Sequence, residues 1–108
     1  MTLEEYQKAA EKTALYPEVY RVLYPALGLV GEAGEVANKV KKILRDHEGA
    51  LPPDLREALL DELGDVLWYV ALLARDLGAS LEAVAEGNLR KLASRKARGA
   101  LKGSGDDR

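Results

Sequence analysis

Several residue types are missing or scarce in this chain of 108 residues. It has no cysteine, which excludes disulfides and thiolate metal sites and is compatible with a reducing cytoplasm. It has no phenylalanine and few β-branched residues, whereas Ala, Leu, Glu and Lys abound, so an all-α fold is expected. The single histidine, His47, excludes the paired ExxH motifs of a di-iron carboxylate bundle.

Neither sign of charge dominates, because 16 basic and 18 acidic residues leave a net charge of -2. This balance gives no support for a nucleic-acid-binding surface. No apolar run is long enough to cross a bilayer, and TLEEYQ after Met1 does not read as a signal peptide. We therefore expect a cytoplasmic single domain, residues 1–108, that binds neither membranes nor nucleic-acid polymers.

Breaks and caps divide the chain into four expected helices. These run from Thr2 to about Leu15, from about Ala26 to His47, from Asp54 to Leu77, and from Ser80 into the basic stretch NLRKLASRKAR. Thr2 and Glu5 form a capping box, Pro52 and Pro53 break the chain, and Gly78 suits a helix end. The expected architecture is four-helix bundle-like and oligomeric, because a chain this short buries only a modest core.

Apolar spacing predicts which faces are buried. The expected core stripe of the second helix is Leu29, Ala33, Val36, Val40 and Ile43, and that of the third is Leu59, Leu63, Val66, Val70 and Leu77. The stretch VLWYVALL in the third helix is apolar nearly all round, so it must be buried on more than one side. Trp68 and Leu72 fall on the second side, and we expect them in or near a subunit interface.

Two pairs of acids recur at a spacing of three residues, Glu32 with Glu35 and Glu62 with Asp65. Residues i and i+3 share a helix face, so two adjacent helices would bring four carboxylates together. Such a group must protonate or meet a cation, and an oxygen-only site suits a hard ion such as Mg²⁺ or Mn²⁺. The sequence therefore predicts a metal site of these four residues.

Four glycines, Gly28, Gly31, Gly34 and Gly64, lie in the helical segments that carry these acids. An interior glycine costs roughly 1 kcal/mol relative to alanine. Their recurrence beside the acids predicts that another helix or a ligand approaches the backbone closely there.

GEAGE at residues 31–35 followed by ELGDVLWY at 62–69 resembles the MazG-like nucleoside triphosphate pyrophosphohydrolases. These belong to the all-α NTP pyrophosphatase superfamily, whose hallmark is ExxE, a spacer and ExxD. YQKAAEKTALYP, NLRKLASRKARG and GSGDDR extend the resemblance over nearly the whole chain. It implies a four-helix fold that forms homodimers or homotetramers, and Mg-dependent hydrolysis of a nucleoside triphosphate to monophosphate and pyrophosphate, as in nucleotide-pool house-cleaning.

The resemblance also implies roles for single residues. Some relatives carry a further acid before the first ExxE, proposed as the base, whereas this chain has Gly31 there, so Glu35 is our candidate to accept the proton of the attacking water. The phosphates would be met by basic and polar side chains on two helices. These are Lys39, Asn88, Lys91 and Arg95.

Two other functions remain open from the sequence. One is a non-enzymatic helical module that binds a metal or a partner, which would not need the basic face around Lys91 and Arg95. The other is a dUTPase or a phosphoribosyl-ATP pyrophosphatase from the same superfamily, although GEAGEV and GSGDDR favour the MazG-like branch.

Overall fold

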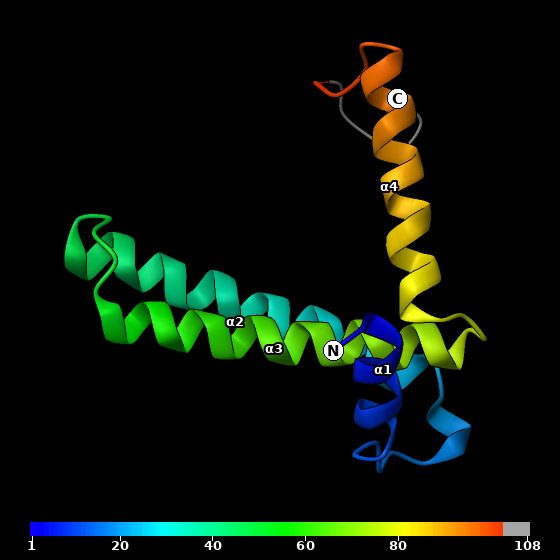
Figure 1. Ribbon diagram of the computed structural model, residues 1–108. Helices are drawn as coiled ribbons and strands as arrows, with labels where there is room; N and C mark the ends of the chain where they lie inside the picture. The colour runs from blue at the N-terminus through cyan, green and yellow to red at the C-terminus, as the bar shows by residue number, and fades with distance from the viewer. Residues whose placement is uncertain (103–108) are drawn as a thin grey trace.

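The computed structural model describes residues 1–102, and every regular element in that range is helical. The elements are α1 (Leu3–Glu11), the 3₁₀ turn η1 (Glu18–Tyr20), α2 (Leu23–His47), α3 (Pro53–Asp76) and α4 (Leu81–Ala97) (Figure 1). The expected all-α chain with four α-helices is confirmed. The GSGDDR ending, residues 103–108, lies outside the described residues.

Helices α2 and α3 form a long antiparallel hairpin, which is the largest helix–helix contact of the chain (Figure 1). Of the residues in the two predicted core stripes, only Ile43 is buried, with 5% of its surface exposed. The half-buried ones are Leu29, Val36, Leu59, Val66 and Val70. Val40, Leu63 and Leu77 keep 40%, 52% and 66% of their surface exposed, and Ala33 is exposed as well, so the assignment of these four residues to the core was wrong. Two helices alone cannot cover more than one narrow stripe of each other.

Helices α1 and α4 both pack on the C-terminal half of α3, where the best-buried apolar cluster lies. Ala10 of α1, Ala71 and Leu72 of α3 and Leu81 of α4 form this cluster. Leu72 has no exposed surface, so its prediction as an interface residue was wrong. The second apolar side of α3 is covered by α1 and α4 of the same chain, while Trp68 packs at the edge of the cluster.

Gln7 holds this junction together with three hydrogen bonds. Its amide nitrogen donates to the carbonyl oxygens of Ala71, at 3.0 Å, and Ala79, at 3.2 Å. Its amide oxygen accepts from the backbone N–H of Leu81 at 3.0 Å. Because Gln7 is buried, these bonds pair polar groups that water does not reach, and they link α1 to α3 and α4.

Local chemistry sets most helix boundaries as expected. The capping box of Thr2 and Glu5 is present, and Ser80 Oγ accepts from the backbone N–H of Ala83. Helix α1 ends at Glu11 rather than near Leu15, and the Thr13 hydroxyl donates back to the Ala10 carbonyl just beyond that end. Helix α2 begins at Leu23, three residues earlier than expected, because Pro25 is tolerated in a first turn.

The connector before α2 contains a strained turn at Val22. This residue has φ 69° and ψ -54°, and the Leu23 N–H donates to the Arg21 carbonyl at 2.8 Å, which together define a γ-turn of the rare form. Asp76, at the end of α3, accepts the Val22 N–H at 2.9 Å and the Tyr16 hydroxyl at 2.8 Å. Arg75 also donates to both Asp76 and Tyr16.

This network sets the ionisation of its members. Burial alone would raise the pKa of Asp76, but the hydrogen bonds from Val22, Tyr16 and Arg75 outweigh it and lower that pKa below its ordinary value. Burial and the bond to Asp76 raise the pKa of Tyr16 to about 12. The connector is therefore fastened to α3 by a charged, fully covered carboxylate.

A single chain is an open shape with much uncovered apolar surface. Its radius of gyration is 16.6 Å, against about 13 Å for a compact domain of this length. Helix α4 leaves the end of α3 and runs away from the hairpin (Figure 1). Large apolar side chains stay exposed on both helices of the hairpin, among them Leu23, Leu27, Val30 and Leu44 on α2 and Leu60, Leu63 and Leu67 on α3. None of the described helices is both long and apolar enough to cross a membrane.

Candidate functional site

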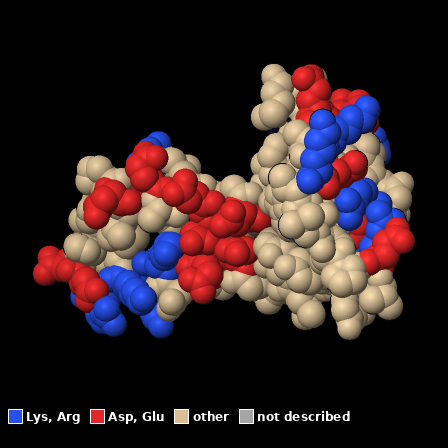
Figure 2. All heavy atoms as spheres, turned by 90° about the horizontal axis from the view of Figure 1, so that it is seen from below, with Lys and Arg blue, Asp and Glu red and all other residues tan. Residues whose placement is uncertain are grey.

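Carboxylates from α2 and α3 meet in the middle of the hairpin. Glu32 of α2 and Glu62 and Asp65 of α3 each offer one oxygen, and these oxygens all lie within 4.8 Å of one another. Figure 2 shows acidic side chains gathered in a continuous group at the centre of this face. Three of the four predicted metal ligands therefore come together.

Repulsion between the neighbouring carboxylates affects the pKa of Glu32. The pKa of Glu32 is raised, first by its hydrogen bond with Glu62, then by desolvation and by the charges of Glu62, Asp65 and Glu35. A hydrogen bond between two carboxyl groups requires a proton, so without a cation Glu32 holds its proton more tightly than an isolated glutamate would. A bound cation would remove that repulsion.

Lys39 supplies one positive charge at the edge of the cluster. Its Nζ lies 3.6 Å from Glu62 Oε1, and both side chains are largely covered. Lys39 was predicted to meet phosphates, and its position beside the acids is compatible with that role. One ammonium group cannot neutralise three carboxylates, so the site still favours a further cation.

Glu35 lies beside the group but is not one of the three converging acids. Its carboxylate is close enough to raise the pKa of Glu32, yet the side chain is exposed. It lines a separate open hollow of about 440 Å³ on α2, together with Gly31, Gly34 and Asn38. A step of three residues on a helix turns the side chain by about 60°, which separates Glu35 from Glu32.

An aromatic cavity of about 320 Å³ adjoins the acids. Thr13, Trp68 and Tyr69 line it together with Glu32 and Asp65. The Trp68 indole N–H donates to Thr13 Oγ1 at 2.8 Å, and the rings of Trp68 and Tyr69 meet edge to face with centroids 5.0 Å apart. Burial raises the pKa of Tyr69, and Tyr24, Glu32 and Asp65 raise it further, so the phenol stays neutral beside the acids.

The glycines divide into one close approach and three open positions. A Cβ on Gly28 would overlap the ring of Tyr69, so α2 and α3 approach closely there as predicted. A Cβ on Gly31, Gly34 or Gly64 would meet nothing within 4 Å. Within the described part of a single chain, no other helix approaches the backbone closely at these three glycines.

The predicted phosphate-binding residues of α4 are not brought to the acids within one chain. Asn88 and Lys91 are exposed, whereas Arg95 keeps only 8% of its surface. The C-terminal half of α4 lies far from the middle of the hairpin (Figure 1). Their role as phosphate ligands remains a prediction.

The oxygen-only donor set fits a hard divalent cation. All three converging side chains are carboxylates and offer only oxygen atoms, which suits Mg²⁺ or Mn²⁺ rather than a softer metal. The raised pKa of Glu32 follows from the same crowding of carboxylates, which a bound cation would relieve. His47, the only histidine, lies near the far end of the hairpin.

Sequence reasoning missed part of the wall around this group. Tyr69 follows Asp65 by four residues, a spacing that puts both on one face of α3, and both line the cavity. Thr13 carried no signal, because it reaches the cavity from the segment after α1 through its bond to Trp68. Tyr6 of α1 is also near enough for Asp65 to add to the raised pKa that burial gives it.

Known proteins match this chain over most of its length. The sequence profile of the MazG nucleotide pyrophosphohydrolase domain matches residues 24–99, which include all four converging or adjacent acids. Gene 37 protein of Mycobacterium phage L5 is 52% identical over 114 aligned positions, covering 100% of both chains. No solved structure matches at a significant level.

Proposed function

Because this chain belongs to the MazG nucleotide pyrophosphohydrolase family, we propose that it hydrolyses (deoxy)nucleoside triphosphates between the α and β phosphates. The products are a nucleoside monophosphate and pyrophosphate. The observation that carries this proposal is the convergence of Glu32, Glu62 and Asp65 on one point of the hairpin. Phosphoryl chemistry needs mainly positioning and charge neutralisation, and this group supplies a place for both.

We assign a divalent ion, Mg²⁺ or Mn²⁺, to Glu32, Glu62 and Asp65, with Glu35 as the fourth predicted ligand. When bound, the ion would neutralise phosphate charge and make a nearby water more acidic. Glu35 has an exposed carboxylate next to the group, which supports its assignment as the acceptor of the water proton. Lys39 holds Glu62 in place and offers its remaining N–H bonds to a phosphate.

The aromatic cavity is our candidate for the nucleoside. Trp68 and Tyr69 offer flat apolar surface within reach of the acids, and the Thr13 hydroxyl adds a polar group. A base in this cavity would leave its phosphates beside Glu32 and Asp65. The neutral phenol of Tyr69 suits an uncharged base better than a phosphate.

We further propose that the working form is a homodimer or homotetramer in which α4 of one copy reaches the acids of another. Asn88 and Lys91 are exposed on a basic helix that points away from its own hairpin. A second copy would also cover the exposed apolar side chains of α2 and α3. Such an enzyme would act on the cytoplasmic nucleotide pool, where cleavage of unwanted triphosphates is a house-cleaning reaction.

The test is pyrophosphate release from a panel of canonical and damaged (deoxy)nucleoside triphosphates with Mg²⁺, followed by a coupled inorganic pyrophosphatase. Glu32→Gln and Glu62→Gln should each lower the rate roughly 100-fold, because each removes a carboxylate that would hold the divalent ion at the reacting phosphates. Glu57→Gln is the matched control, since Glu57 lies on α3 but pairs with Arg56 in solvent. Equal rates for Glu62→Gln and Glu57→Gln would refute the site.

A further inference from the structure

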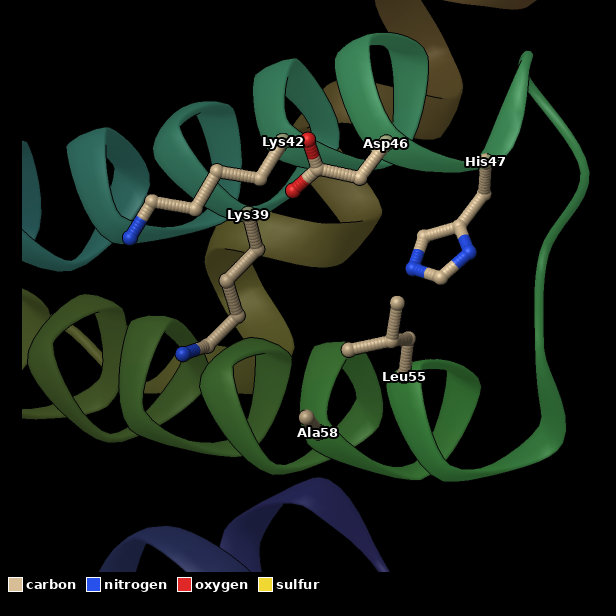
Figure 3. A pocket seen from close by; sticks show the side chains of 6 residues that line it. All are labelled: Lys39, Lys42, Asp46, His47, Leu55 and Ala58. Carbon is tan, nitrogen blue, oxygen red and sulfur yellow. The ribbon is translucent and has the colours of Figure 1, made fainter.

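A second cavity lies in the same hairpin, on the other side of the acids from the aromatic cavity. It measures about 250 Å³ and is bounded by α2 and α3 near the loop that joins them. Its lining residues are Lys39, Lys42, Asp46, His47, Leu55 and Ala58. Figure 3 shows the ammonium ends of Lys39 and Lys42 both pointing away from the loop and toward the middle of the hairpin, where the acids lie.

The charge of this cavity is positive where it faces the acids. Asp46 is held by two hydrogen bonds from Arg45, at 2.6 and 2.8 Å, so its charge is compensated locally. Lys39 shares its charge with Glu62. Among residues 1–102, no carboxylate lies within 4.0 Å of the Lys42 ammonium. The Lys42 charge helps to lower the pKa of Asp46, which Arg45 already holds, so the ammonium group of Lys42 remains available to an anion in the cavity.

Contacts across the hairpin place three features in a fixed order. Tyr69 lies over Gly28, Glu32 meets Asp65 and Glu62, Lys39 meets Glu62, and Lys42 lines the cavity with Ala58 and Leu55. Because α2 and α3 are antiparallel, these contacts run from an aromatic end through the acids to a basic end. A nucleoside triphosphate has the same order of chemistry, from a flat base to a terminal phosphate.

The geometry points to a defined direction of substrate binding and to a new binding residue. We infer that Lys42, with Lys39 beside it, receives the terminal phosphate of the substrate and then the leaving pyrophosphate in the second cavity. The inference rests on the proposed hydrolysis and adds the polarity of the substrate along the hairpin. Lys42 binds and orients the phosphate chain, and no bond is made or broken at its ammonium group.

Calorimetry tests this directly. The ligands are inorganic pyrophosphate with Mg²⁺, and the triphosphate and diphosphate of the nucleoside that the wild type cleaves best, with Ca²⁺ replacing Mg²⁺ to slow turnover. Lys42→Ala should weaken pyrophosphate and triphosphate binding about tenfold and leave diphosphate binding within about twofold. Lys42→Arg, which keeps the charge, should retain most of the affinity. Lys41→Ala is the control, because Lys41 faces the hollow that contains Glu35.

Two results would overturn the inference: equal binding by Lys42→Ala and Lys41→Ala, or equal losses for triphosphate and diphosphate. Unchanged thermal unfolding of Lys42→Ala excludes a folding defect, as expected for an exposed side chain. A wild type that binds pyrophosphate but releases none from any triphosphate would refute the proposed hydrolysis, and the pyrophosphate titrations would still decide the role of Lys42.

Discussion

At the scale of single residues, Gly28 shows what the recurring glycines do. Among the glycines of residues 1–102, only Gly28 has a neighbouring side chain, the ring of Tyr69, in the space that a Cβ would occupy. Gly31 stands three residues away in the same helix with open space around it. Both positions are helical but only Gly28 is packed against a side chain. A comparison of alanine substitutions at the two positions therefore distinguishes the effect of helix propensity from that of packing.

We expect Gly28→Ala to destabilise the fold by about 1–3 kcal/mol, because Tyr69 must move away from its place against α2. Gly31→Ala should instead be neutral or stabilising, by up to about 1 kcal/mol, because alanine favours a helix and meets nothing. Urea unfolding of both variants measures the difference. Destabilisation of the same size in both would show that the ring of Tyr69 does not rest on Gly28.

Asp76 gives the second prediction at this scale. Its pKa is lowered in the folded chain, so its contribution to stability is complete above the ordinary pKa of aspartate, about 4, and is lost as the pH falls through the lowered value. Asp76→Asn should cost about 3 kcal/mol at pH 7, because the carboxylate is fully covered and bonded to Arg75. The gap in melting temperature between wild type and variant should narrow below pH 4. A gap that stays constant from pH 7 to pH 3 would contradict this account.

At the scale of elements, the sequence predicted where helices begin and end better than it predicted how the helices pack together. The caps at Thr2 and Ser80 could be read from sequence because each depends on residues within one turn. The burial of Leu72 could not, since it depends on where α1 and α4 lie against α3. The exposure of Leu63 could not either, since it depends on how narrow a stripe of α3 is covered by α2. Gln7 gave no signal at all, because its partners are 64 to 74 positions away in sequence.

We therefore expect the docking of α1 to depend on Gln7. Gln7→Leu keeps the size of the side chain but leaves the Leu81 N–H and two carbonyls without their partner, which should cost about 2–4 kcal/mol. Lys8→Leu is the control, because Lys8 lies in solvent on the next position of α1. Chemical unfolding measures stability, and hydrogen exchange at Leu81 should rise only in the Gln7 variant. Wild-type exchange there would show that the amide does not secure α4.

For the candidate site, sequence spacing identified the acids but not their final grouping. The two motifs predicted that four acids would come together, and the structure brings oxygens of three of them within 4.8 Å of one another. The position of Glu35 depends on its angle around α2, which a pattern of ExxE alone does not specify. The cavities on either side arise from packing between helices, which no local motif encodes.

At the scale of the whole molecule, the exposed apolar stripes call for a partner surface. Leu60, Leu63 and Leu67 recur at spacings of three and four on α3, and Leu23, Leu27 and Val30 do the same on α2. Scattered apolar residues are ordinary on a protein surface. Apolar residues aligned along both helices of a hairpin form a continuous exposed surface, which is typical of an interface with another chain.

We expect sedimentation equilibrium to give at least the mass of a dimer. Leu63→Glu should weaken association at least about tenfold, because a charge would be buried in the contact between copies. Leu15→Glu is the matched control, since Leu15 is 91% exposed but lies in the connector rather than on a stripe. A monomeric wild type, or equal effects of the two substitutions, would contradict a hairpin-mediated assembly.

The γ-turn at Val22 has a consequence for how relatives of this chain diverge. A β-branched residue at positive φ persists only while its surroundings hold it, and here the carboxylate of Asp76 holds its amide. The two positions, 54 apart in the chain, should therefore covary. Homologues without an acid at the second position should carry glycine or asparagine at the first, where the same bend is reached without a clamp.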